Sequence, residues 1–251
     1  METAGRYVLL LAAGVAAGAI NVVAGGGSFL SLPVLMFLGL PPGIANATNR
    51  LGIVTQNLVA VWSFDRHGVL ERGAALWAAL PATLGAGVGA LLALEVSDAA
   101  FVRLLAILMI VLSLGSLWSP SRRRAGTERA AAGAGAVLAR TAGFFVVGIY
   151  GGFVQAGVGF LFLALTSLVG LDLVRGNAVK VLSILSMTAV ALAVFAWNGR
   201  VDWVTGGVLA AGFLAGGLLG ARWTVLKGHR WVRRVVTATI ILFALKLLLA
   251  P

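Results

Sequence analysis

The chain has no cysteine, two histidines and few charged residues. Without cysteine it can form no disulfide and no thiolate metal site, and it has no thiol for catalysis. Acidic residues are scarce, and we expect all of them in loops, next to loops or at the termini: Glu2, Asp65, Glu71, Glu95, Asp98, Glu128, Asp172 and Asp202. The long apolar segments between them therefore offer no carboxylate for a proton relay or for acid–base chemistry.

Apolar residues dominate what is present. They make up 60% of the chain, against 11% charged residues, and the mean hydropathy is +1.03. A soluble domain is about half apolar and about a quarter charged. Runs such as 101–118 and 201–221 approach or exceed the length that crosses a bilayer as a helix. This composition predicts an all-α integral membrane protein, multi-pass, with the lipid bilayer as its surroundings.

Two stretches of the sequence resemble each other, 24–50 and 156–180. Each opens with alanine and glycines, continues as an apolar run, and then has a Gly-Leu turn and an Asn-Ala pair. The offset is 132 at the glycines and 131 from the turn onward. We therefore predict two homologous repeats: residues 1–118 form the first, 119–136 a cytoplasmic linker, and 137–251 the second. A duplicated apolar chain with a glycine-broken segment in each half is typical of secondary transporters.

Each half contains five apolar segments. We expect them near 7–24, 28–40, 44–64, 73–94 and 99–118, and near 137–155, 159–170, 173–197, 202–225 and 231–250. The second segment of each half has only about twelve residues, or about 18 Å of helix, which is too short for a hydrocarbon core of about 30 Å. The sequence thus predicts about eight long transmembrane helices and two short helices that are re-entrant or halves of a broken helix.

The basic residues test the topology. If the first two segments enter the membrane and return, one side receives most of them: Arg66, Arg72, Arg122, Arg123, Arg124, Arg129, Arg175, Lys227, Arg230, Arg233 and Arg234. The opposite side receives Arg6 and Arg200. This bias makes the first side cytoplasmic and the two repeats inverted. If the first two segments instead form one broken span, the basic residues fall on both sides.

Three passages carry a family resemblance: AGGGSFLSLPVLMFLGLPPGIANATN at 24–49, HGVLERGAALWAALPATLGAGVGALLA at 67–93, and its copy at 198–223. They resemble the TauE/SafE sulfite exporters, also called the 4-toluene sulfonate uptake permease family, and the resemblance covers essentially the whole chain. It implies a carrier in the bacterial inner (cell) membrane for sulfur oxyanions or organosulfonates, without a cofactor. The second half departs from the pattern, because AGVG replaces the fuller glycine run.

Glycines break both short segments at their start, and we expect an anion site there. The residues concerned are Gly25, Gly26 and Gly27 ahead of Ser28, and Gly157 and Gly159 in the second half. A helix that begins inside the membrane directs its positive N-terminal end into the protein, where an anion can bind. The alternative is that these glycines serve only close helix packing.

Two cations, Arg50 and Lys180, follow the short segments. A cation at membrane depth is costly unless it is paired or hydrated, and an anionic substrate is a candidate partner. Alternatively, Arg50 reaches an interface or binds backbone carbonyls. Asn46 and Asn177 match at the 131 offset and are expected either to contact substrate or to cap the following helices. Uncharged donors complete the predicted site: Asn21, Asn49, Gln56 and Gln155. Amides at membrane depth are expected either to hydrogen-bond the oxygens of the anion or, equally, to tie helices together.

The sequence therefore favours a secondary transporter that exports a small anion, such as sulfite or an organosulfonate, by alternating access at a midplane site between the repeats. An interior-negative potential drives a monoanion outward with about 2.3 kcal/mol per 100 mV. An intramembrane enzyme is disfavoured, because Ser28 and Ser183 have no acid or histidine at depth to activate them. A non-transporting subunit or scaffold of a larger complex is the remaining alternative.

Other partners are limited. The net charge of +11 is attributed to arginine-rich cytoplasmic loops rather than to nucleic-acid binding. The glycine-rich stretches 85–89 and 212–220 have small residues four apart, which suits tight helix contact and makes a homodimer conceivable.

Overall fold

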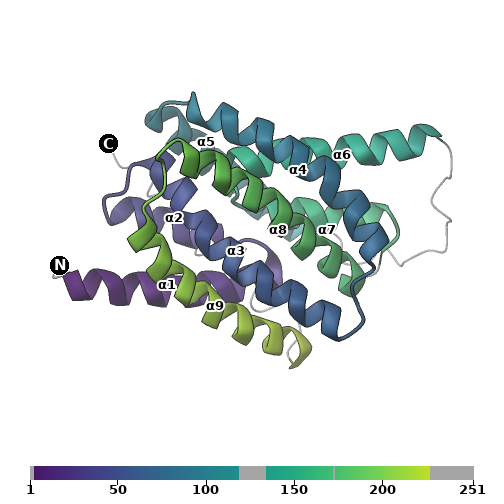
Figure 1. Cartoon of the computed structure of the whole chain (residues 1–251), viewed down its shortest axis with the longest axis horizontal. Helices are drawn as coiled ribbons and strands as arrows, with labels where there is room; N and C mark the ends of the chain where they lie inside the picture. Colours follow the sequence, from purple (N-terminus) through teal and green to yellow (C-terminus); the bar gives the residue numbers. More distant parts are fainter. Residues whose placement is uncertain (1–2, 119–133, 172, 227–251) are drawn as a thin grey trace.

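A computed structural model describes residues 3–118, 134–171 and 173–226 (Figure 1). This part of the chain is helical and contains no strand. Its helices are α1 (Thr3–Ala24), α2 (Ser28–Phe37), α3 (Pro42–Arg66), α4 (Arg72–Leu94), α5 (Asp98–Trp118), α6 (Ala134–Phe153), α7 (Val158–Leu168), α8 (Leu173–Trp197) and α9 (Trp203–Leu226). They match nine of the ten predicted segments. The tenth, 231–250, lies outside the described residues, as does most of the predicted linker.

Five of the described helices are long and apolar enough to cross a membrane. The spans are Ala4–Val22, Arg72–Leu94, Ala134–Phe153, Val174–Trp197 and Trp203–Gly220. Helix α3 is as long as any of them, at 25 residues, but it carries Asn46, Asn49 and Arg50 and is less apolar. An all-helical membrane protein is thus supported.

The two short helices fold back on the helices that precede them. Arg6, near the start of α1, donates a hydrogen bond to the carbonyl of Leu38, just after α2. In the second half, a Cβ on Gly143 at the middle of α6 would lie 3.3 Å from Leu165 in the last turns of α7. With 10 and 11 residues, α2 and α7 are about 15 Å and about 17 Å long. Each therefore forms a hairpin with the long helix that precedes it.

Glycines allow two pairs of helices to pack backbone against backbone. Helix α9 lies along α1 in parallel, so that Gly212 faces the Leu11 carbonyl and Gly220 the Ala19 carbonyl, 2.5 and 2.7 Å from where a Cβ would stand. Helix α4 lies along α6 in the same way, and a Cβ on Gly85 or Gly89 would overlap a carbonyl of α6. The prediction that these glycines form packing surfaces is confirmed, and the surfaces face helices of the same chain.

These contacts divide the described helices into two groups. We call α1, α2, α3, α5 and α9 the first bundle, and α4, α6, α7 and α8 the second bundle. Within each bundle the helices pack on one another, whereas the main contacts between the bundles are α3 against α8 and α1 against α7. Each bundle therefore takes one long helix from the other half of the sequence, since α9 joins the first and α4 the second.

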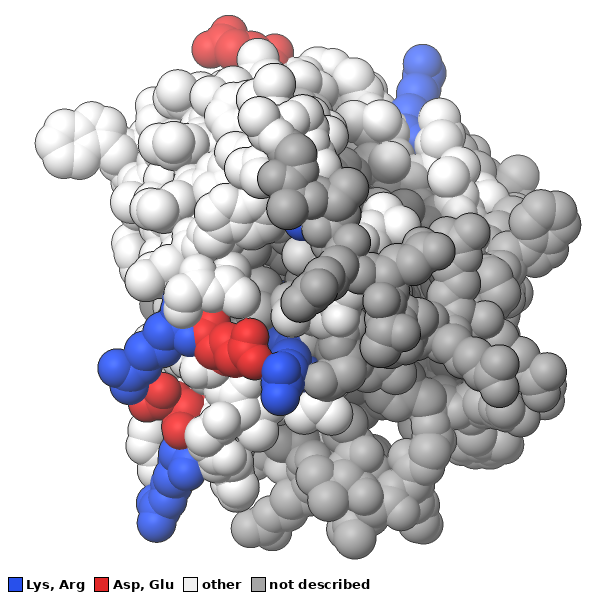
Figure 2. Space-filling model, turned by 90° about the vertical axis from the view of Figure 1, so that its right-hand side faces the viewer, with Lys and Arg blue, Asp and Glu red and all other residues white. Residues whose placement is uncertain are grey.

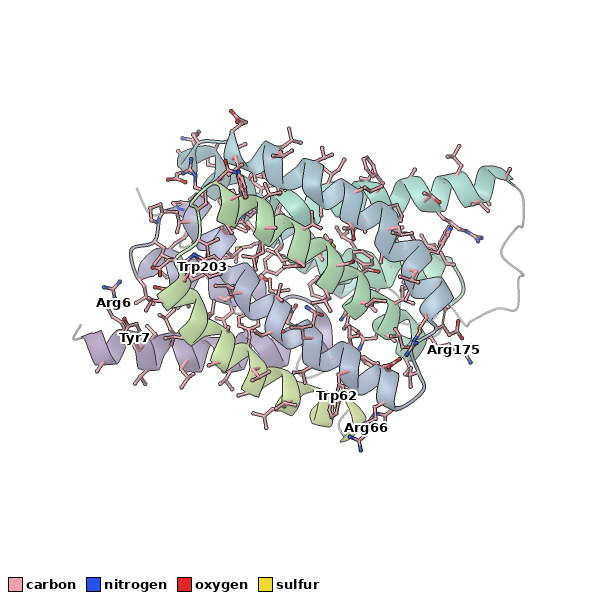
Figure 3. The ribbon with its side chains drawn as sticks, viewed as in Figure 1. Arg6, Tyr7, Trp62, Arg66, Arg175 and Trp203 are labelled. Carbon is pink, nitrogen blue, oxygen red and sulfur yellow. The ribbon has the colours of Figure 1, made fainter. Side chains whose placement is uncertain are left out.

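The two ends of the molecule carry arginine and aromatic residues (Figure 3). Arg6, Tyr7 and Trp203 lie at one end, here called the Arg6 end, and Trp62, Arg66 and Arg175 at the other, the Arg66 end. Trp62 and Trp203 are largely exposed, as expected for side chains at a membrane interface.

Basic and acidic side chains touch one another on the Arg66 end (Figure 2). Two ion pairs are formed there, Arg72–Asp65 at 3.1 Å and Arg175–Glu71 at 2.8 Å. Both pairs are exposed to solvent, so that each contributes little to stability.

Candidate anion-binding site

The two helix breaks meet in the interior of the molecule. Gly25 and Gly157 adopt left-handed backbone angles, with φ of +84° and +75°, which side-chain-bearing residues rarely adopt. A Cβ on Gly25 would lie only 2.8 Å from the Cα of Gly159. Glycine at these positions lets the chain reverse and lets the two breaks touch. The starts of α2 and α7 are thereby brought together between the bundles.

Arg50 is fully buried beside the second break. Its Nη1 donates to the carbonyl of Gly151 and to Oε1 of Gln155, both at 3.1 Å, and its Nη2 donates to the carbonyl of Gly152 at 2.6 Å. The last carbonyls of a helix have no partner within the helix, and α6 ends at Phe153. Arg50 of the first bundle therefore caps a helix of the second. Carbonyl binding, the alternative raised for this arginine, is confirmed.

The charge of Arg50 is not neutralised by these partners. All of them are uncharged, and the ring centroid of Phe195 lies 4.9 Å from the guanidinium carbon. Its Nε atom has no hydrogen-bond partner among the described residues. The buried polar residues of the same part of the chain include Arg50 and Lys180 but no aspartate or glutamate. The site thus has a net positive charge in a water-poor interior, which favours an anion.

A neutral polar network lies next to Arg50 in the first bundle. Asn49 accepts a hydrogen bond from Ser31 at 2.6 Å and donates one to Ser28 at 3.1 Å. Asn21 donates to Gln56 at 3.2 Å, and a Cβ on Gly27 would lie 2.7 Å from Asn21. These amides and hydroxyls join α1, α2 and α3 around the first break. In this arrangement they hold the three helices together.

Asn46 also joins the two bundles. Its amide nitrogen donates to the carbonyl of Phe153 at 2.9 Å, and its Oδ1 has no partner among the described residues. Because α3 begins at Pro42 and α8 at Leu173, neither Asn46 nor Asn177 stands at a helix start. The expectation that these asparagines cap the helices is therefore wrong. Pro42 occupies the first position of α3, where its missing N–H costs nothing.

Lys180 and Asn177 lie apart from this cluster. Arg50 stands about two turns from the start of α3, Lys180 about two turns from the start of α8, and these helices run antiparallel. For helices of 25 residues this places the two cations roughly 15 Å apart along the axis. The structure therefore gathers the following predicted residues: Asn21, Gly25, Gly26, Gly27, Ser28, Asn46, Asn49, Arg50, Gln56, Gln155, Gly157 and Gly159.

Two contributors escaped the sequence analysis. Ser31 completes the network at Asn49, and its position one turn after Ser28 on the same helix face could have revealed it. Phe195, which stacks on Arg50 from α8, gives no signal in the sequence because it stands 145 positions away in an ordinary apolar run.

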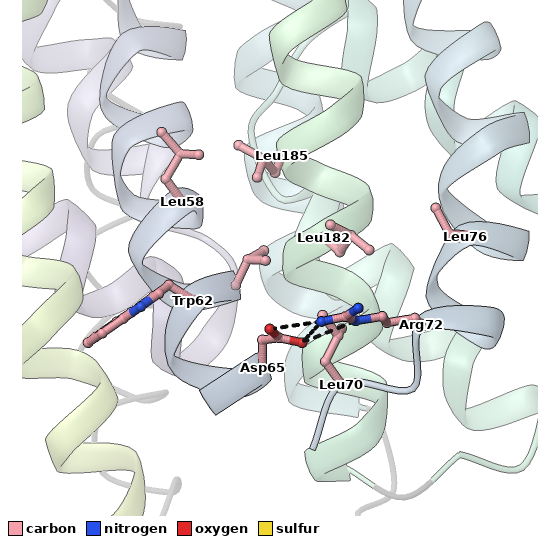
Figure 4. A pocket seen from close by; sticks show the side chains of 9 residues that line it. Leu58, Trp62, Asp65, Leu70, Arg72, Leu76, Leu182 and Leu185 are labelled. Atoms are coloured by element: carbon pink, nitrogen blue, oxygen red, sulfur yellow. Dashed lines mark hydrogen bonds and ion pairs between the residues drawn. The ribbon is translucent and has the colours of Figure 1, made fainter. Parts of the chain in front are cut away.

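A groove of about 360 Å³ opens at the Arg66 end between α3, α4 and α8 (Figure 4). Leucines line most of it, and the Asp65–Arg72 ion pair lies at its end. None of the predicted site residues lines this groove. At the Arg6 end, the cavity between the bundles has only about 30 Å³, beside Gly43, Phe195 and Arg200.

Comparison with known proteins identifies the family. The family described as "Sulfite exporter TauE/SafE" matches residues 10–247, nearly the entire chain. The chain belongs to the TauE/SafE family. Family membership agrees with the resemblance found in the glycine-rich passages, and it makes the chain a membrane transporter by class. No solved structure matches the chain.

Curated relatives carry transporter names. The chain is 30% identical over 230 residues to a "Probable membrane transporter protein" of Haemophilus influenzae, covering 91% of this chain and 89% of the relative. It is 31% identical over 233 residues to "Probable membrane transporter protein YfcA" of Escherichia coli K12, covering 92% and 86%. A Sinorhizobium relative, "Probable membrane transporter protein ORF9", is 27% identical over 243 residues, covering 96% and 92%.

Proposed function

We propose that this TauE/SafE member exports a small sulfur oxyanion, sulfite or an organosulfonate, across the inner membrane. The observation that carries the proposal is the buried charge of Arg50 where the two helix breaks meet. Its described partners are neutral, and the buried set around it holds no carboxylate. An anion would supply the missing negative charge, and neighbouring amides and hydroxyls would donate to its oxygens. The family's description points to sulfite in particular.

Alternating access would arise from movement along the seam between the bundles. Arg50 and Asn46 of α3 bind the end of α6 across this seam, and Gly25 and Gly159 touch across it. A site on the seam is opened to one side or the other when the bundles rock. The groove between the bundles at the Arg66 end supports an opening toward the basic side of the membrane, which is the cytoplasmic side in this proposal.

We propose further that the two halves are inverted repeats. Three pairs of glycines with left-handed backbone angles support this, each pair separated by 131 or 132 positions: Gly25 and Gly157, Gly39 and Gly170, Gly68 and Gly199. The helix contacts agree, because α1 with α9 and α6 with α4 are equivalent pairs under the same offset. In such transporters the substrate site lies between the repeats near the midplane.

The test is flux from proteoliposomes that contain the purified chain. Vesicles are loaded with sulfite, sulfate, thiosulfate, methanesulfonate, 4-toluenesulfonate or chloride, and the membrane potential is clamped with potassium and valinomycin. We expect potential-dependent efflux of one or more sulfur oxyanions and none from protein-free vesicles. If no anion moves, with or without a proton or sodium gradient, the proposal is wrong and a non-transporting membrane subunit becomes the better description.

A further inference from the structure

Lys180 and Ser183 are buried on α8 without partners. Lys180 is 2% exposed and Ser183 is 0% exposed. Neither the Nζ of Lys180 nor the Oγ of Ser183 has a hydrogen-bond partner among the described residues. Residues three apart on a helix lie on neighbouring parts of one face, so that the two groups are close in space. Buried polar groups nearly always have a hydrogen-bond partner, and two neighbouring groups without one suggest that a bound ligand supplies it.

The corresponding position of the first half shows what is missing. At the 131 offset Lys180 corresponds to Asn49, whose amide is satisfied by Ser28 and Ser31 of α2. The positions of α7 that correspond to these serines are Phe160 and Leu163, which offer no side-chain acceptor. In the second bundle a lysine thus stands where the first has an asparagine, and two apolar residues stand where the first has the serines that bind this asparagine. Lys180 does not tie α7 to α8 in the way that Asn49 ties α2 to α3.

This pair is separate from the Arg50 cluster but connected to it along α8. Met187, one turn beyond Ser183, is fully buried, and its methyl group occupies the space where Gly151 would carry a Cβ. The carbonyl of the same Gly151 accepts the hydrogen bond from Arg50. Met187 therefore stands between the two cations.

We propose that Lys180 and Ser183 form a second anion-binding site, which receives the anion on the Arg66 side before or after it binds at Arg50. The inference rests on the proposed function and adds a second binding site to the route of the anion. One cation and one hydroxyl in otherwise apolar surroundings match a singly charged oxyanion, such as an alkylsulfonate or hydrogensulfite. A dianion such as sulfate would keep one charge without compensation.

The experiment uses the purified chain in nanodiscs and proteoliposomes, with methanesulfonate as the probe and sulfate for comparison. The single variants are Lys180→Gln, Lys180→Arg, Ser183→Ala and Arg50→Gln. A double variant combines Arg50→Gln with Lys180→Gln. Ser186→Ala is the matched control, because Ser186 lies one turn from Ser183 but accepts a hydrogen bond from Thr83 of α4. Efflux and the thermal unfolding midpoint, with and without probe, are measured for each.

We expect Lys180→Gln to lower methanesulfonate efflux by about tenfold or more, because the charge that binds the anion is gone. Its unfolding midpoint should stay the same or rise, because an unpaired buried cation has been removed. Lys180→Arg should keep much of the efflux, Ser183→Ala should lose part of it, and Ser186→Ala should behave as the unsubstituted chain. Arg50→Gln should still be stabilised by methanesulfonate, and the double variant should not be.

Two results would overturn the second site while leaving the proposed function intact: normal efflux in Lys180→Gln, or loss of probe stabilisation in Arg50→Gln alone. A drop in the unfolding midpoint of Lys180→Gln with unchanged efflux would assign the lysine a structural role and also contradict the inference. If the unsubstituted chain neither moves nor is stabilised by any of the anions, the proposed function itself fails.

Discussion

Arg50 has two roles that a sequence cannot separate. It caps the carbonyl end of α6 with three hydrogen bonds, and it places a positive charge where the helix breaks meet. Hydrogen bonds that involve a charged group contribute about 1.5–3 kcal/mol each. Arg50→Ala is therefore expected to reduce stability as well as transport, and a variant that keeps the charge is more informative.

For Arg50→Lys we expect a large loss of efflux, about tenfold or more, with a smaller loss of stability than for Arg50→Ala. An ammonium group keeps the charge but cannot reproduce the planar fork that reaches Gly151, Gly152 and Gln155 together. Efflux and the thermal unfolding midpoint of both variants provide the measurement. Full efflux in Arg50→Ala would show that the charge is not needed.

Gly25 and Gly39 offer a matched pair of substitutions. Both have left-handed backbone angles, but a Cβ on Gly25 would meet the backbone of Gly159, whereas a Cβ on Gly39 has nothing within 4 Å. Gly39→Ala should cost about 1–2 kcal/mol of backbone strain. Gly25→Ala should cost clearly more, because the two breaks must also separate. Unfolding midpoints of both variants give the difference, and equal losses would mean that the contact between the breaks contributes nothing.

At the scale of elements, the predicted helices and their order agree well with the structure. Long apolar runs give the long helices, and the Gly-Leu turns at 39–40 and 170–171 end the short ones. The start of α3 is misjudged by two residues, because two prolines open the helix where the sequence suggests a loop. The sequence does not predict that α2 and α7 fold back, since length alone does not distinguish a hairpin from half of a broken span.

Close packing of α4 on α6 is tested by Gly89→Ala, with Gly87→Ala as its control. A Cβ on Gly89 would overlap the Ile149 carbonyl, whereas a Cβ on Gly87 has its nearest neighbour, Val190, at 3.8 Å. Gly87→Ala should be neutral or stabilise the helix by roughly 0.5–1 kcal/mol. Gly89→Ala should lower the unfolding midpoint by several degrees. Similar midpoints for the two variants would contradict the packing described for this pair.

At the scale of the whole molecule, the sequence could not predict that α9 packs in the first bundle and α4 in the second. The predicted repeat suggests two halves that move against each other, whereas the contacts group the helices into bundles that mix the halves. Which helices pair depends on surfaces that lie far apart in the sequence, such as Gly14 with Gly212 and Gly148 with Ala82. Small-residue spacing reveals that a helix packs tightly but not against which partner.

Cross-linking distinguishes bundle motion from half-against-half motion, and the cysteine-free chain is suited to it. Leu58→Cys with Leu76→Cys spans the groove between the bundles but stays within the first half. Glu71→Cys with Arg175→Cys joins the two halves but stays within the second bundle. A reducible bifunctional thiosulfonate should stop efflux in the first pair and leave it in the second, and reduction should restore it. The opposite pattern would show that the halves are the moving units.

The exchanged helices also have a consequence for how the chain is made. The glycine face of α1 is complete only when α9 is present, and the two helices are separated by about 180 residues of sequence. At a synthesis rate of about 5–20 residues per second, roughly 10–35 s pass before the partner emerges. During this interval the face of α1 that carries Gly14 and Gly18 lacks its partner in the folded protein. The first bundle is therefore completed only by a helix from the second half of the sequence. Neither half of the chain can form all of its helix contacts without the other half.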